Sequence, residues 1–126
     1  MLNLLHKQYV KLKNRKLLFI HEIFKDYTMI PKETYIQNLS LIEKFKDLEG
    51  CIVECGTWRG GMIGGIAALL GDKRNYFLFD SFEGLPKAKQ IDGESANNWQ
   101  NDVDSPYYFN NCKAEISFAE IGRAHV

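Results

Sequence analysis

Residues 53–61 read VECGTWRGG and residues 79–86 read FDSFEGLP, and these two stretches decide the fold. Each overlaps the end of a short apolar run, at 51–53 and at 75–79, that predicts a strand, and the first strand is expected to be fully buried. A strand, a helix and a second strand at this spacing form a βαβ unit with a right-handed crossover. The sequence therefore predicts an α/β fold built on a parallel pair of strands.

Several glycines lie in the connection between the two predicted strands. Gly56 lacks a Cβ atom, so a ligand can approach the backbone there. Gly60 and Gly61 open the connecting helix, whose free N–H groups point toward the same place. Gly64 and Gly65 lie inside that helix, and we expect them to let it pack close to the sheet.

Two acidic residues stand near the ends of the predicted strands, and they bear on the choice of ligand. Glu54 would repel a pyrophosphate, but it suits a cationic amino-acid group such as the methionine end of S-adenosylmethionine. Asp80 can accept hydrogen bonds from ribose hydroxyls. The pair favours S-adenosylmethionine over NAD, and the glycine spacing also lacks the middle glycine of G-x-G-x-x-G. Two simpler interpretations stay open: Glu54 pairs with Arg59, and Asp80 is a cap or turn residue.

Length, net charge, apolar runs and cysteine spacing exclude several classes of protein. The chain has 126 residues and no net charge, which indicates one small domain and argues against a nucleic-acid binder. No apolar run is long enough to cross a bilayer, and lysines interrupt the apolar core that a secretory signal would need. The cysteine usage favours free thiols in a reducing compartment, so we expect a cytoplasmic protein. The three cysteines match no common zinc pattern, and Cys51 and Cys55 are interpreted as small hydrophobes in a buried strand.

Helical patterns flank the strand region. Residues 2–26 form an amphipathic, lysine-rich pattern, and residues 32–48 form a second apolar stripe after Pro31. The first pattern suits either a membrane-surface or partner-binding helix, or a helix packed on the domain or on a second subunit, and packing is favoured. Residues 87–104 are predicted to be a polar surface loop, and residues 105–119 a short helical element.

At its two deciding stretches, and at YTM in residues 27–29, the sequence resembles the macrocin O-methyltransferase (TylF-like) family over about residues 27–92. The resemblance implies a Rossmann-like class I methyltransferase fold and transfer of a methyl group from S-adenosylmethionine to a hydroxyl, often on a sugar. It also implies that Tyr27 to Met29 sit in a lid over the cofactor. The cofactor-binding residues it implies are Glu54, Gly56, Thr57, Trp58, Gly60 and Gly61 in the loop, with Asp80 and Ser81 on the ribose side.

The sequence departs from the family in its second half, where the family binds magnesium through aspartates. We therefore expect a fold truncated after about two strands, with magnesium only in the full-length protein. This chain is expected to hold the cofactor-binding half alone, with no assignable catalytic residue, and to be inactive by itself. Residues 120–126, EIGRAHV, resemble the translated start of a sequencing-library adapter, although a natural helix end capped by Gly122 is the alternative. The expected organisation is a helical segment at 1–50, a partial S-adenosylmethionine-binding domain at 51–119, and this artefact.

Two other functions remain open. One is an oxidoreductase that binds NAD or a nucleotide sugar, and the other is a short interaction module that uses helix 2–26 as its contact surface. For the methyltransferase we expect a small-molecule hydroxyl acceptor, such as a sugar, no nucleic-acid or membrane partner, and self-association as an open possibility.

Overall fold

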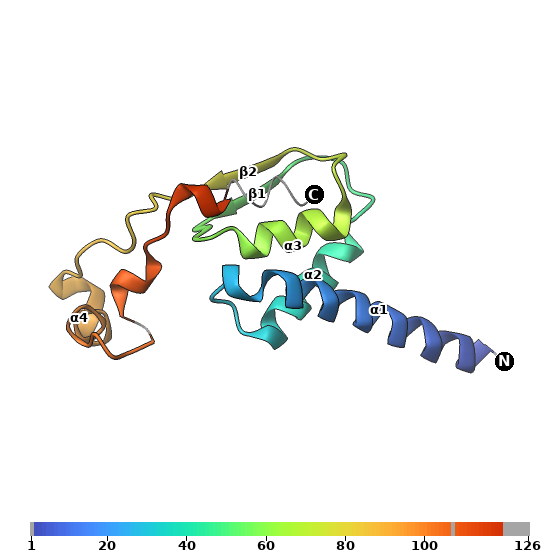
Figure 1. The fold of residues 1–126 in the computed structure, drawn as a ribbon, viewed down its shortest axis with the longest axis horizontal. Helices are drawn as coiled ribbons and strands as arrows, with labels where there is room; N and C mark the ends of the chain where they lie inside the picture. The colour runs from blue at the N-terminus through green and yellow to red at the C-terminus, as the bar shows by residue number, and fades with distance from the viewer. Residues whose placement is uncertain (1, 107, 120–126) are drawn as a thin grey trace.

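The computed structural model describes residues 2–106 and 108–119, so the predicted adapter segment at 120–126 lies outside the described residues. Its elements, in chain order, are α1 (Leu2–Phe24), η1 (Lys25–Tyr27), α2 (Lys32–Lys44), β1 (Ile52–Cys55), α3 (Gly61–Leu70), β2 (Tyr76–Phe79), η2 (Gln90–Asp92), α4 (Gly93–Asn101) and η3 (Phe109–Cys112). Figure 1 shows α3 between the two strands and the paired helices α1 and α2. None of these helices has the length and apolar content that a membrane crossing requires.

Strands β1 and β2 form a parallel two-stranded sheet, which confirms the predicted α/β character. Ile52 pairs with Tyr76 and Cys55 with Phe79. The pairing continues one step past β1, where the N–H of Gly56 donates to the carbonyl of Phe79 at 2.8 Å. Both strands therefore end at the same edge of the sheet.

The prediction of a fully buried first strand is wrong. Both strands alternate between half-buried and exposed residues, and Val53 and Phe77 are 54% and 48% exposed. The reason is the period of two along a strand, since Ile52 and Tyr76 pack toward the helical core while their neighbours point away from it. Cys51 and Cys55 are exposed, so their interpretation as buried hydrophobes is also wrong.

The core lies where α1, α2 and α3 meet. The buried apolar side chains from these three helices are Leu17, Ile20, Phe24, Tyr35, Leu39, Met62, Ile63, Ile66 and Ala67. The predicted stripes of α1 and α2 supply the first five. Leu12, one of the apolar residues at helical spacing in the predicted pattern of residues 2–26, is instead 64% exposed. Helix α2 ends at Lys44 rather than at residue 48, because turns occupy residues 45–47.

Two glycines inside α3 determine how closely the helices approach. A Cβ on Gly64 would lie 2.6 Å from a ring carbon of Phe24, and a Cβ on Gly65 would lie 1.9 Å from the hydroxyl of Tyr35. The missing side chains of these glycines therefore allow α1 and α2 to pack closely against α3. The prediction that they bring the helix close to the sheet is wrong, because their bare face points to the other helices.

The region after β2 differs from the prediction. Residues 87–104 contain η2 and α4 rather than a plain loop, and the Asn97 and Asn101 side-chain amides donate to the carbonyls of Gly93 and Asn97 at 2.8 and 3.0 Å. An apolar pattern does not reveal this helix, because none of its residues is buried. The predicted helical element at 105–119 is broken into η3 and a helical turn at 116–119, with Lys113 bridged to Glu83 between them.

Candidate functional site

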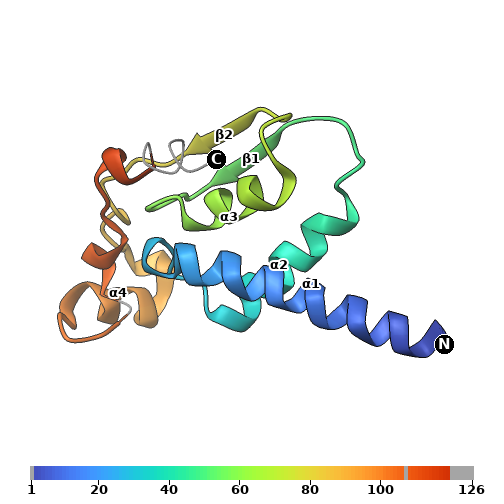
Figure 2. The ribbon, with the colours of Figure 1, turned by 45° about the vertical axis from the view of Figure 1, so that its right-hand side comes forward.

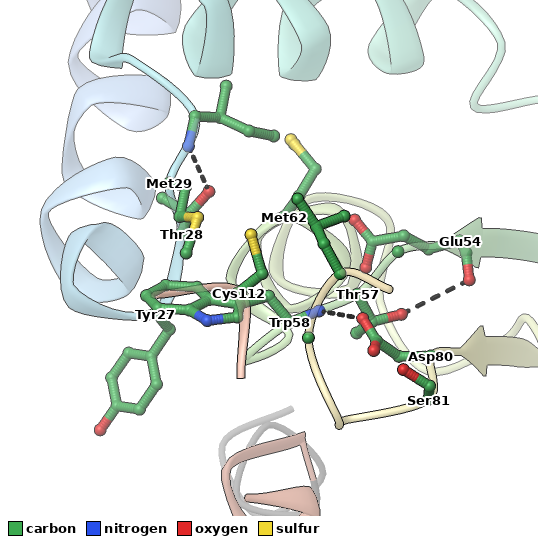
Figure 3. Close-up of a pocket in the computed structure, with 14 residues that line it drawn as sticks. Tyr27, Thr28, Met29, Glu54, Thr57, Trp58, Met62, Asp80, Ser81 and Cys112 are labelled. Carbon is green, nitrogen blue, oxygen red and sulfur yellow. Dashed lines mark hydrogen bonds between the residues drawn. The ribbon is translucent and has the colours of Figure 1, made fainter. Parts of the chain in front are cut away.

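A pocket of about 450 Å³ lies where the parallel strands end. This is the edge at which open α/β sheets bind their ligands. Six of the predicted site residues line it: Glu54, Gly56, Thr57, Trp58, Asp80 and Ser81. Figure 3 shows these side chains gathered from the glycine turn and from the segment after β2.

Gly60 and Gly61, the remaining predicted site residues, support the pocket without lining it. Gly60 is the N-cap of α3 and has a φ of +78°, a left-handed conformation that favours glycine. A Cβ on Gly61 would lie 2.4 Å from the carbonyl oxygen of Tyr27, and the Gly61 carbonyl accepts a hydrogen bond from the Tyr35 hydroxyl at 2.8 Å. The start of α3 is thus tied to η1 and α2, while direct contact of these glycines with a cofactor stays a prediction.

Asp80 holds the two halves of the turn together. Its Oδ2 accepts the backbone N–H of Trp58 and its Oδ1 accepts that of Phe82, both at 2.8 Å. These two donors have positive φ values of +51° and +59°, which are strained for residues other than glycine. The Trp58 N–H, followed by that of Phe82, lowers the pKa of Asp80. Asp80 is therefore a turn residue, as the simpler interpretation held, and its contact with ribose stays a prediction.

Glu54 differs from Asp80 in its hydrogen bonding and in the direction of its pKa shift. Its Oε2 is buried and accepts no hydrogen bond from the described residues. Burial raises the pKa of Glu54 to about 7, the N–H of Ile63 opposes this shift, and the negative charge of Asp80 adds to it. Glu54 is a pocket-lining acid that loses its proton near neutral pH.

The simpler interpretation, in which Arg59 pairs with Glu54, is wrong for the described part of the chain, where no such ion pair forms. The Arg59 guanidinium instead lies 4.6 Å from the centre of the Trp58 ring and 4.7 Å from that of Phe118. Such cation–π stacking places the positive charge of Arg59 against aromatic faces. Glu54 is consequently left without a cationic neighbour from the turn.

A strap formed by residues 109–119 returns to the glycine turn and closes one side of the pocket. The indole N–H of Trp58 donates to the carbonyls of Asn111 and Lys113 at 2.9 and 3.2 Å. This contact brings Cys112 into the pocket wall, where burial raises the pKa of its thiol. Cys112 could not be predicted as a pocket residue, because the contact joins residues more than fifty positions apart in the chain.

The opposite wall comes from the segment between η1 and α2. Tyr27, Thr28, Met29 and Ile30 all line the pocket, and the Thr28 hydroxyl accepts the N–H of Ile30 at 3.1 Å. Met62 also lines the pocket, and in Figure 3 it lies between this segment and Glu54. The segment predicted to be a lid thus borders the pocket, and its movement stays a prediction.

No group of three His, Cys, Asp or Glu side chains placed to hold a metal ion occurs within residues 2–106 and 108–119. The magnesium expected for the full-length protein therefore stays a prediction, with no ligand assigned to it.

Comparison with known proteins gives one match. The sequence model of the macrocin-O-methyltransferase (TylF) family matches residues 14–119, which include both strands, the glycine turn and every residue of the pocket. No curated protein and no solved structure matches the chain.

Proposed function

We propose that this chain, which belongs to the macrocin-O-methyltransferase (TylF) family, binds S-adenosylmethionine in the pocket at the strand ends. Membership of that family supports a methyltransferase, and we infer that the methyl group goes to a hydroxyl of a small molecule such as a sugar. We also infer that the two-stranded parallel unit is part of a Rossmann-like class I sheet.

The observation that carries this proposal is the unpartnered Oε2 of the Glu54 carboxylate in the pocket wall. A buried acid with a free oxygen and a raised pKa gains a favourable interaction when a cation enters beside it. The methionine end of S-adenosylmethionine carries an ammonium and a sulfonium, so it supplies that charge. A pyrophosphate, as in NAD or a nucleotide sugar, would meet the charges of Glu54 and Asp80 and be repelled.

The remaining walls suit the nucleoside end of the same ligand. Each oxygen of the Asp80 carboxylate accepts one backbone N–H and has a further lone pair for a ribose hydroxyl. A Cβ on Gly56 would meet no protein atom within 4 Å, so a ligand can approach the backbone there. A volume of about 450 Å³ falls within the range of small-molecule sites.

Each part of the pocket has a separate role in this proposal. Glu54 binds the cationic end of the cofactor, Asp80 holds the turn and orients the ribose, and the Met29 segment and Met62 exclude water with apolar surface. The cofactor itself supplies an electrophilic methyl group. No residue within the described ranges is assigned as the base that removes the acceptor's proton.

Isothermal titration calorimetry with S-adenosylmethionine, S-adenosylhomocysteine, NAD and UDP-glucose tests the proposal. We expect heat of binding for the first two ligands and none for the two pyrophosphate ligands. Binding of NAD in the same pocket, weakened by Ser81→Trp and unaffected by Glu54→Gln, would favour an oxidoreductase and overturn the proposal. Failure of all four ligands to bind the folded chain would also overturn it.

A further inference from the structure

Helix α1 carries a second apolar stripe that the core does not use. Leu12, Phe19 and Ile23 are 64%, 67% and 47% exposed. They are spaced by seven and four residues, so they share one face of the helix. The buried Leu17 and Phe24 are rotated by roughly 130° from that face, a little over a third of a turn. The helix therefore has two separate apolar faces, and only one of them is covered.

The uncovered stripe follows the heptad spacing of helix pairs. Leu12 and Phe19 lie one heptad apart, and Lys16 and Ile23 occupy the other seam position. In the sequence the same spacing continues backward to Leu5 and Tyr9. Figures 1 and 2 show that the N-terminal part of α1 projects beyond α2, α3 and the sheet.

Two charged residues flank the stripe and suggest what covers it. Arg15 and Glu22 are exposed, lie on the same edge and are one heptad apart. In an antiparallel pair of identical helices, residues of this edge face each other across the seam, so Arg15 of each chain meets the partner's Glu22. The pairing is reciprocal, as a two-fold contact between identical surfaces requires.

We propose that α1 pairs antiparallel with α1 of a second copy of this chain through the Leu12, Phe19 and Ile23 stripe. In that register Leu12 packs against the partner's Ile23, and the Lys16 stem and ammonium lie over the partner's Phe19 ring. The two reciprocal ion pairs between Arg15 and the partner's Glu22 flank these layers. Glu22 also contacts Lys25 of its own chain, and this exposed pair leaves room for a second cation.

The same features fit a membrane surface less well. A bilayer offers Glu22 no partner, whereas a second copy offers both Lys16 and Glu22 one. The stripe shares no residue with the pocket, so the inference does not depend on the proposed function.

Sedimentation velocity on the complete chain over a range of concentrations tests the pairing. We expect a dimer that Phe19→Glu dissociates, with the dissociation constant raised about 100-fold or more. Leu18→Glu is the matched control, because Leu18 is also exposed, at 41%, but lies off the stripe. Circular dichroism should show both variants folded. A chain that is monomeric at every concentration, or equal dissociation by both variants, would overturn the proposal.

Charge reversal then tests the antiparallel orientation. Arg15→Glu and Glu22→Arg should each raise the dissociation constant of the dimer about tenfold, because each places like charges opposite each other across the seam. The double variant should restore the original dissociation constant. Mixing the two single variants should produce a heterodimer, since every pair across the seam is then opposite in sign. No rescue and no heterodimer would overturn the antiparallel register. If the chain is monomeric and binds vesicles of phosphatidylcholine and phosphatidylglycerol, and Phe19→Glu abolishes that binding, then a membrane covers the stripe and the proposed dimer is wrong.

Discussion

The ends of β1 and β2 each present one carboxylate to the pocket, and the two carboxylates have opposite surroundings. Asp80 lies just past β2 and accepts two backbone N–H groups, which lower its pKa. Glu54 lies within β1, where burial raises its pKa to about 7 and one oxygen has no hydrogen-bond partner. The acid that follows its strand thus holds a turn, whereas the acid inside its strand keeps one oxygen without a hydrogen-bond partner.

The largest effect expected from this difference concerns binding at Glu54. At pH 8, Glu54→Gln should lower the affinity for S-adenosylmethionine about 100-fold, because the substitution removes the charge that faces the cationic end of the cofactor. Calorimetry measures this, with the exposed Glu49→Gln as the control. Unchanged affinity in the Glu54 variant would mean that Glu54 does not bind the cationic end of the cofactor.

The next effect concerns the stability that Asp80 supplies. Asp80→Asn should lower the free energy of unfolding by about 2 kcal/mol, because charge-assisted bonds to two left-handed residues are weakened. Urea unfolding followed by circular dichroism measures the change, and the exposed Asp47→Asn is the control. If the two variants unfold alike, Asp80 does not hold the turn.

A pH series separates the two acids by the sign of their effect. The pKa of Glu54 is about 7 in the folded chain, above its ordinary value of 4.5, so the folded state binds more protons between these values. Stability from Glu54 is therefore present below pH 4.5 and is lost as the pH rises through 7, by about 1.5 kcal/mol after allowing for partial exposure. Glu54→Gln should flatten this decline in urea unfolding measured from pH 5 to pH 8. A decline of equal slope in the variant would assign it to another group.

The smallest effect tests the backbone at the end of β1. Gly56→Ala should cost about 1 kcal/mol of stability, because φ there is +80°. Gly71→Ala is a matched control with a φ of +82°, open space around the added Cβ and no place in the pocket. Both variants should lose stability by thermal unfolding, Gly71→Ala more because its ψ of -172° suits glycine alone, but only Gly56→Ala should weaken the binding of S-adenosylmethionine, by about tenfold. Equal affinities would mean that the ligand does not approach Gly56.

Local sequence was sufficient to predict the strands, the start of α3 and the two acids. An acidic residue at the end of an apolar run and a glycine pair before a helix are short-range signals, and Glu54, Asp80 and Gly60 occupy the expected places. The cap at Gly60 is confirmed because it depends only on its own φ and its neighbours.

Contacts between distant segments could not be predicted in this way. The sequence predicts that Gly65 packs close to the sheet, yet Gly65 faces Tyr35 of α2. A glycine in a helix indicates a close contact but does not indicate which segment makes it. Cys112 reaches the pocket only because Trp58 binds carbonyls of the strap. Helix α4 escaped prediction because its stabilising bonds come from asparagine side chains, such as that of Asn97, rather than from an apolar stripe.

The position of Trp58 has an optical consequence. The chain has two tryptophans: Trp58 lines the pocket beneath the Arg59 guanidinium, and Trp99 is 42% exposed on α4. Replacing Trp99 with phenylalanine would leave a single emitter whose indole touches both the turn and the strap. Its emission wavelength and quenching would then report, without any label, whether a ligand has entered beside Glu54.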